Sequence, residues 1–135
     1  MESTKQTVLD LTNQLLQSIQ NADWATYSKL CDPSLSCFEP EAQGHLVEGM
    51  EFHKFYFDLP RGGGKAPVNT TMASPHVRLI GDGNVAIVSY VRLVQRVTES
   101  GGPKTAAFEE TRVWEKGSNG EWRHVHFHRS KASLE

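Results

Sequence analysis

The chain has 135 residues, 22% charged and 38% hydrophobic, with a formal net charge of −2 at pH 7. This composition is typical of one globular domain, and the slight acidic excess argues against non-specific nucleic-acid binding. No apolar run reaches the length of a membrane span, no signal segment opens the chain, and two cysteines without CxxC spacing exclude a disulfide framework. We therefore expect a cytoplasmic protein that binds neither membranes nor nucleic acids.

The first half of the chain is predicted to be mainly helical. Apolar residues recur at helical spacing in the first stretch: Val8, Leu11, Leu15 and Ile19. This pattern predicts an amphipathic helix over about residues 4–21. A second short helix is expected to begin at the cap Asn21 and to end before Pro33, because the residue before a proline avoids helical geometry.

The middle of the chain predicts two short strands and a third helix. The strands are expected at residues 35–39 and 45–48, on either side of a turn near Pro40. The helix is expected at residues 50–58, where His53 shares a side with Met50 and Phe57. A glycine-rich loop then covers residues 59–67. Its glycines and Lys65 lack the spacing of a phosphate-binding loop, so no nucleotide cofactor is expected.

The second half predicts four sequential strands at about residues 68–80, 84–98, 104–116 and 121–131, separated by turns rich in glycine. Helices that precede sequential antiparallel strands indicate an α+β fold, with helices on one face of a strongly curved sheet. Such a sheet, bent around the long first helix, forms a cone with a pocket at its open end. We expect a single domain over residues 4–131, flanked by short termini at 1–3 and 132–135.

Three arginines fall on the strand faces that should be buried. Side chains two apart share a strand face, so Arg92, Arg112 and Arg129 each point the same way as apolar neighbours. A guanidinium stays charged inside a protein, and burying it without a partner costs several kcal/mol, roughly. Either internal carboxylates or an anionic ligand must compensate these charges.

The opposite face of these strands is also apolar in part. Residues predicted to share this outer face are Val85, Ile87, Val91 and Leu93, together with Trp122, His124 and His126. In a sheet with one face exposed to solvent, apolar and polar residues should alternate more clearly along each strand. We interpret this face as an interface with another subunit, since aromatic and apolar residues are enriched in such contacts. Chance variation within a short strand is the alternative.

Several segments together resemble a known family. These are residues 44–57 (GHLVEGMEFHKFYF), 31–33 (CDP), 38–42 (FEPEA), 109–114 (EETRVW) and 125–130 (VHFHRS). They are similar, in the same order, to the association or hub domain of calcium/calmodulin-dependent protein kinase II, and the likeness runs from about residue 5 to 130. It implies a cone of the nuclear transport factor 2 (NTF2-like) type.

The resemblance also implies a function. In the family this domain assembles kinase subunits into two stacked rings, dodecameric or tetradecameric, with the outer sheet face forming much of the contact. It further implies a pocket lined by His53, Arg92, Arg112 and Arg129, which in some members takes small carboxylates. This chain departs from the family pattern in having no kinase domain and in its glycine-rich loop at residues 59–65.

Alternatives remain for each pocket residue. The arginines can form an internal ion network with Glu39, Glu109 or Glu110, and Glu110 shares a face with Arg112. His53 either donates to an anion and titrates near neutral pH, or simply packs against Phe57.

Metal binding and catalysis are not expected. Although His124, His126 and His128 alternate on one strand, no third ligand with a supporting carboxylate is evident. An NTF2-like enzyme of the isomerase or dehydratase type is the alternative function, but it needs a base aimed at the substrate, and arginine cannot serve as one. A metabolite sensor, whose pocket occupancy adjusts the assembly, is a third hypothesis.

Overall fold

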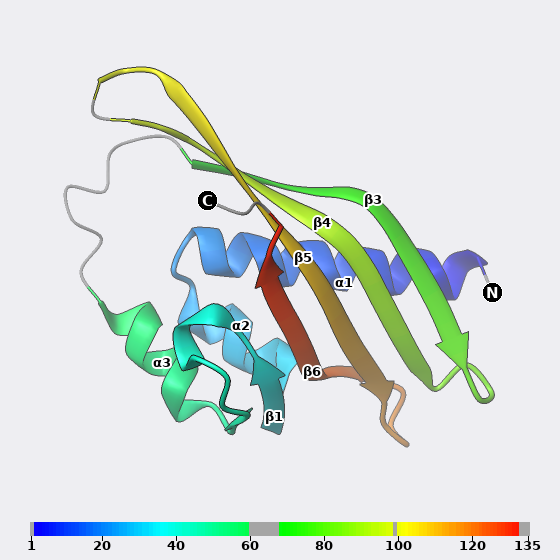
Figure 1. Cartoon of the computed structure of the whole chain (residues 1–135). Coiled ribbons are helices and arrows are strands. Elements are labelled where there is room, and N and C mark those ends of the chain that lie inside the picture. Colours follow the sequence, from blue (N-terminus) through cyan, green and yellow to red (C-terminus); the bar gives the residue numbers. More distant parts are fainter. Residues whose placement is uncertain (1, 60–67, 99, 133–135) are drawn as a thin grey trace.

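A computed structural model describes residues 2–59, 68–98 and 100–132, and it confirms the α+β class (Figure 1). The helices are α1 (Glu2–Gln20), α2 (Trp24–Leu30), the short 3₁₀ helix η1 (Pro40–Ala42) and α3 (Glu51–Asp58). The strands are β1 (Cys31–Phe38), β2 (Val47–Glu48), β3 (Val68–Ile80), β4 (Val85–Val97), β5 (Pro103–Lys116) and β6 (Trp122–Lys131). Most of the predicted glycine-rich loop lies outside the described residues. No helix in the described part is long and apolar enough to cross a membrane.

All six strands belong to one sheet, in the order β2-β1-β6-β5-β4-β3. Neighbouring strands are antiparallel, as predicted, except that β1 and β6 run parallel. The edge strand β3 bends at an irregularity between Ala73 and His76, where Ser74 has a φ of 49° and Pro75 has no N–H to contribute to a ladder. Figure 1 shows the long sheet strands curving around α1.

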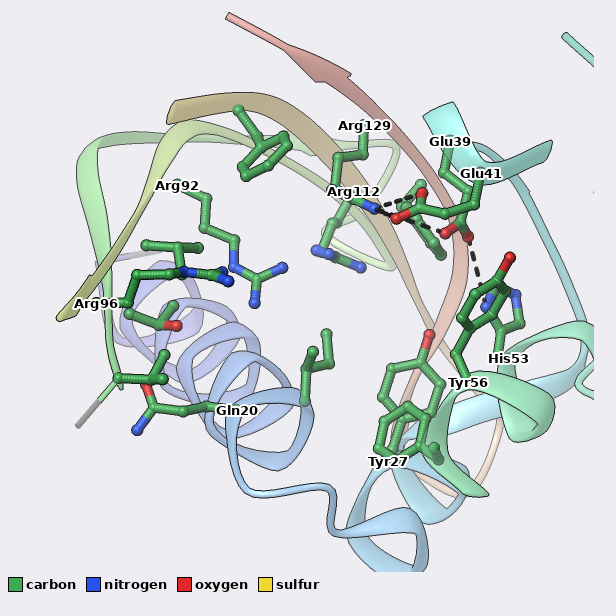
Figure 2. Close-up of a pocket in the computed structure, with 17 residues that line it drawn as sticks. Gln20, Tyr27, Glu39, Glu41, His53, Tyr56, Arg92, Arg96, Arg112 and Arg129 are labelled. Atoms are coloured by element: carbon green, nitrogen blue, oxygen red, sulfur yellow. Dashed lines mark hydrogen bonds and ion pairs between the residues drawn. The ribbon is translucent and has the colours of Figure 1, made fainter. Parts of the chain in front are cut away.

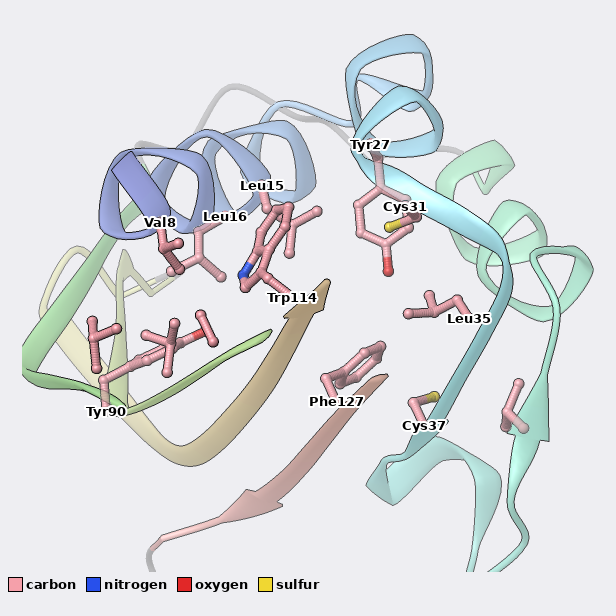
Figure 3. Packing of buried hydrophobic residues seen from close by; sticks show 14 residues of the cluster. Val8, Leu15, Leu16, Tyr27, Cys31, Leu35, Cys37, Tyr90, Trp114 and Phe127 are labelled. Carbon is pink, nitrogen blue, oxygen red and sulfur yellow. The ribbon is translucent and has the colours of Figure 1, made fainter. Parts of the chain in front are cut away.

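The core fills the space between α1 and the inner face of the sheet (Figure 3). Val8, Leu15 and Leu16 of α1 are fully buried, as the helical spacing of apolar residues requires. Trp114 of β5 is fully buried too, and its indole Nε1 donates a hydrogen bond of 3.0 Å to Thr12 Oγ1. This bond satisfies the one polar group that Trp114 brings into the core.

The strand parity predicted for β4 is confirmed. Its inward residues are all buried: Ala86, Val88, Tyr90, Arg92 and Val94. The outward residues between them remain half-buried.

Two element boundaries differ from the prediction. Asp23, not Asn21, caps α2, because its carboxylate accepts hydrogen bonds from the Thr26 backbone N–H at 3.1 Å and from the Thr26 hydroxyl at 2.6 Å. Ala22, at a φ of 54°, makes the turn that separates α1 from this cap. Strand β1 begins at Cys31 and includes Pro33, which lies in the irregular stretch between Cys31 and Ser36 where no residue pairs with β6.

A bulge in β6 overturns one predicted strand face. Val113 pairs with His126 but the next residue, Trp114, pairs with His124, so Val125 is an extra residue on β6. Two residues then oppose one and the alternation of side chains shifts by one position. His124 is consequently fully buried, although the sequence placed it on the outer face, and Val125 leaves the inner face predicted for it beside Phe127.

Candidate arginine-lined anion pocket

A pocket of about 450 Å³ opens between the end of α1, helices α2 and α3, and the inner face of strands β3 to β6 (Figure 2). It brings together the four residues that the sequence singled out: His53, Arg92, Arg112 and Arg129. Sequence reasoning missed two further charged residues that line it, Glu41, which follows β1, and Arg96 of β4. Glu39, which the sequence analysis considered as an ion-network partner, also lines the pocket. Tyr27, Phe57 and Phe127 supply an apolar wall.

Arg112 lies at the base of the pocket, and its guanidinium contacts Glu110, Tyr90 and Phe127. Its Nη2 is 3.0 Å from Glu110 Oε1, its Nε donates to Tyr90 Oη at 2.8 Å, and its guanidinium lies 4.5 Å from the centre of the Phe127 ring. Tyr90 in turn donates to Glu110 Oε1 at 2.5 Å. Although burial opposes the charge of Glu110, Arg112 and Arg92 together hold its pKa below the usual range. Glu110 is therefore a buried carboxylate that stays ionised.

Arg129 is paired with carboxylates at the rim. Its Nη2 donates to both Glu41 oxygens at 2.6 Å and lies 3.8 Å from Glu39 Oε1, and its guanidinium stacks on Phe108 at 4.8 Å. Burial raises the pKa of Glu39, whereas Arg129 outweighs the effect of burial at Glu41 and lowers its pKa. The Glu-Pro-Glu run after β1 is the sequence signal for this pairing, because a 3₁₀ turn at Pro40 brings both carboxylates to one side.

Arg92 is the least compensated of the three arginines. It is 8% exposed, its sole ion pair in the described part is a 3.5 Å contact from Nη1 to Glu110 Oε2, and its Nε has no hydrogen-bond partner there. Glu110 is shared with Arg112, which holds it at shorter range. Burial lowers the pKa of Arg92. The third carboxylate considered from sequence, Glu109, is exposed and takes no part.

His53 is buried beside Glu39 and Cys37. Its Nδ1 lies 3.6 Å from Glu39 Oε2 and its Nε2 lies 3.8 Å from Cys37 Sγ, while Tyr27, Phe52 and Phe127 surround the ring. Phe57, the neighbour expected from helical spacing, instead packs on Trp24 and Tyr27. Burial, reinforced by Arg112, lowers the pKa of His53 to about 4. The expected titration near neutral pH is therefore wrong, and the contact with Glu39 is that of a neutral imidazole.

Cys37, Glu39 and His53 also form the one group of three metal-ligand side chains found among the described residues, with ligand atoms within 4.8 Å of one another. Thiol, carboxylate and imidazole are donors that zinc accepts. However, the Arg129 guanidinium lies 3.8 Å from Glu39, and the charge of Arg112 lowers the pKa of His53. These two positively charged side chains would repel a metal ion bound at this group. We do not assign a metal to this group.

The three alternating histidines of β6 do not share a face. His124 lies in the core, where its Nδ1 is 3.4 Å from Cys31 Sγ and its Nε2 is 3.5 Å from Arg112 Nη1. His126 points to the other face, where its Nδ1 is 2.7 Å from Ser36 Oγ. His128 follows it beside Phe38, with ring centres 5.5 Å apart. The bulge at Val125 thus separates His124 from the pair that the sequence grouped it with.

The architecture defines the class of protein first. A Salmonella enterica NTF2-like superfamily protein has the same fold, with a TM-score of 0.75 at 24% identity over 99% of this chain and 95% of that one. A curved sheet around a long helix, with a pocket at its open end, is therefore an NTF2-like cone.

The family follows from closer relatives. The family model described as "Calcium/calmodulin dependent protein kinase II association domain" matches residues 4–133. The chain is 47% identical over 130 residues to the rabbit (Oryctolagus cuniculus) calcium/calmodulin-dependent protein kinase type II subunit delta, covering 96% of this chain and 24% of that protein. The association domain of the C. elegans kinase superposes with a TM-score of 0.87 at 46% identity, covering 96% of each chain. The chain belongs to the family of calcium/calmodulin-dependent protein kinase II association domains, and it spans about a quarter of the length of the rabbit protein.

Replacing Glu110 by Gln should destabilise the fold. The substitution keeps the shape of the side chain but leaves Arg112 and Arg92 buried without a counter-charge, which costs about 3 kcal/mol or more. Urea unfolding at fixed protein concentration measures this loss. The matched control is Glu121→Gln in the turn before β6, where the side chain is 67% exposed, and it should change stability by about 0.5 kcal/mol or less. Equal effects of the two substitutions would contradict the buried ion cluster.

Stability should fall on acidification, in part because of His53. Its pKa is about 4 in the folded protein against 6.5 as the ordinary value, so between these pH values the unfolded chain binds a proton that the folded one does not. The contribution is complete above pH 6.5 and is lost as the pH falls toward 4, amounting to about 2 kcal/mol between about pH 7 and 5. Unfolding curves at both pH values should show a smaller loss for His53→Gln than for the wild type. Identical losses would show that His53 ionises in the folded protein.

Proposed function

We propose that this chain is a self-association module that builds a homo-oligomer of two stacked rings. The observation that supports this most is the outward face of β4 and its neighbours. Val85, Ile87, Val91 and Leu93 lie on this face and are half-buried in the single chain, while the alternate residues of β4 fill the core. Cross-strand pairing places Ile87 beside Val113, and Leu93 beside Ala107, so apolar pairs recur along this face, with Glu109 opposite Val91 between them.

The proposed interface extends onto β6 and β1. Val113 pairs with His126, and His126 pairs with Ser36, so this row continues across the sheet with a hydrogen bond between the last two side chains. His124 is removed from the predicted interface because it is in the core. Trp122 is removed with it, because it pairs with Lys116 on the face of β5 that carries Trp114 and packs against the core. The proposed contact residues are Val85, Ile87, Val91, Leu93 and His126.

The proposal agrees with the family. The relatives are named as association domains of kinase subunits, and a contact with an apolar centre and polar or charged residues around it is typical of subunit interfaces. Stacked rings, dodecameric or tetradecameric, are the assembly that the resemblance implies for this chain. A kinase segment attached elsewhere in a longer protein would be brought close to its copies by such a ring.

We further propose that the pocket binds small carboxylates. Arg92, Arg112 and Arg129 point into one cavity, and planar guanidinium forks bind carboxylates through two parallel hydrogen bonds. Arg92 has donor capacity left over, since one long ion pair is its only compensation in the described part. Ligand binding to one assembly state better than another would shift the ring population.

The enzyme alternative gains no support from the pocket chemistry. A general base must be free to approach the substrate. In the described pocket, Glu41 is committed to Arg129, Glu39 contacts His53 and Cys37, and His53 is neutral and enclosed by aromatic rings. These side chains hold one another in place instead of pointing toward a reacting group.

Self-association should depend on the outer sheet face. The wild type should sediment with a mass many times that of the 15.1 kDa chain, and Ile87→Asp should dissociate it, because a buried unpaired carboxylate in a subunit contact costs several kcal/mol, roughly. Analytical ultracentrifugation provides the mass, and circular dichroism shows whether each variant stays folded. Phe55→Asp, at a side chain that is 60% exposed on helix α3, is the matched control and should leave the mass unchanged. A wild type that remains monomeric would refute the proposal.

A monocarboxylate such as butyrate should bind the pocket, and Arg92→Gln should weaken this binding by about tenfold or more, since a charge-assisted hydrogen bond is lost. Isothermal titration calorimetry at constant ionic strength measures both dissociation constants. Arg78→Gln removes the same charge from an exposed position on β3 outside the pocket and should have no effect. Absence of binding heat in the wild type would argue against a carboxylate pocket.

A further inference from the structure

The pocket continues beyond the three arginines into a second end that the carboxylate proposal leaves unexplained. This end is lined by Gln20 from the close of α1, Thr70 of β3, and Arg92 and Arg96 of β4 (Figure 2). Three polar atoms here lack any hydrogen-bond partner in the described part of the protein: Arg92 Nε, Thr70 Oγ1 and Gln20 Oε1. Arg92 is 8% exposed and Thr70 is 6% exposed, so protein atoms surround both residues.

Unpaired polar atoms at such depth cost free energy unless something binds to them. In this chain the three atoms belong to residues that line one cavity, so a single bound molecule can satisfy them together. The pairing of Thr70 with Val94 places the hydroxyl next to the strand segment that separates Arg92 from Arg96. These residues therefore form a continuous polar surface along β4.

Arg96 adds a positive charge that no carboxylate in the described part of the protein compensates. It lies four residues after Arg92 on the same strand, so both side chains leave the same face of β4, with Val94 between them. Among the described residues it makes no ion pair, whereas Arg112 has Glu110 at 3.0 Å and Arg129 has Glu41 at 2.6 Å. Figure 2 shows the Arg96 side chain reaching toward the cavity from its rim.

The charges of the site thus fall into two groups. Arg112 with Glu110, and Arg129 with Glu41, are close pairs that leave little charge for a ligand. Arg92 and Arg96 are the guanidiniums that remain under-compensated. A ligand with one carboxylate can neutralise one of them, and a ligand with two can neutralise both.

The volume agrees with an extended ligand. The cavity of about 450 Å³ is roughly fifteen times the share of liquid volume that one water molecule occupies, which leaves room for a chain of several carbons. Tyr27, Phe57, Val68 and Val94 provide apolar contacts for such a chain. Residues four apart on a strand are separated by about 13 Å at Cα, and the long arginine side chains reduce the distance between their charges.

We infer that the pocket selects an aliphatic dicarboxylate with a backbone of about five carbons, with one carboxylate at Arg92 and the other at Arg96. The Thr70 hydroxyl donates to the second carboxylate, and the Gln20 amide accepts from a hydroxyl or amino substituent if the ligand carries one. This inference rests on the proposed carboxylate pocket, and it adds the class of ligand and the residue that distinguishes it.

The test compares glutarate with valerate, which share a five-carbon chain and differ by one carboxylate. Calorimetry on the full chain, at constant ionic strength, should show glutarate binding at least about tenfold more tightly than valerate, since a second charge-assisted pair forms. Arg96→Gln should abolish this preference by weakening glutarate alone, with the dissociation constant of valerate unchanged. The matched control Arg78→Gln should preserve the preference.

Each other outcome counts against the inference. If both acids bind the wild type equally, or if Arg96→Gln leaves their ratio unchanged, the dicarboxylate assignment fails while the carboxylate pocket stands. If Arg78→Gln lowers glutarate binding as much as Arg96→Gln does, the preference reflects overall charge and the assignment fails again. If neither acid binds, the proposed pocket function and this inference both fail.

Discussion

The buried cluster of Arg112, Glu110 and Tyr90 is the interaction on which the rest of the structure depends. Arg112 is 1% exposed, and its charge is compensated by one carboxylate and one phenol oxygen on adjacent strands. This cluster occupies part of the inner face where a core would ordinarily be apolar, and Arg112 also lines the pocket. The same side chains therefore belong to the interior of the fold and to the candidate site.

Much of this arrangement is readable from side-chain alternation, since a strand puts alternate residues on one face whatever its neighbours are. That rule placed Arg92, Arg112 and Glu110 inside the cone before any coordinates. It failed at His124, because a single extra residue at Val125 reverses the parity and leaves no compositional trace. Glu41 was missed for a different reason, because its role comes from a contact with Arg129, 88 residues away, which alternation within one strand cannot report. Arg96 could have been read from alternation, since it shares a face of the predicted strand with Arg92.

The two faces of the sheet carry different side chains and have different proposed roles. The inner face carries ionised groups that are compensated within the chain or available to a ligand, whereas the outer face carries aliphatic and imidazole side chains among exposed charges such as Glu109. Strand β4 contributes to both, with Arg92 inside and Val91 and Leu93 outside. A ligand that shifts Arg92 would thus act on the same strand that we propose contacts the next subunit. Such a direct mechanical link makes coupling between pocket and ring physically reasonable.

The parallel pairing of β1 with β6 has a consequence for biosynthesis. Ser36 and His126, which are hydrogen-bonded neighbours in this ladder, are separated by 90 residues in the sequence. During translation, before β6 has been made, β1 can pair only with the two-residue strand β2. Its other edge then exposes backbone N–H and C=O groups without hydrogen-bond partners. The domain can finish folding only after its last strand has emerged. We therefore expect nascent chains that end before this strand to need chaperones.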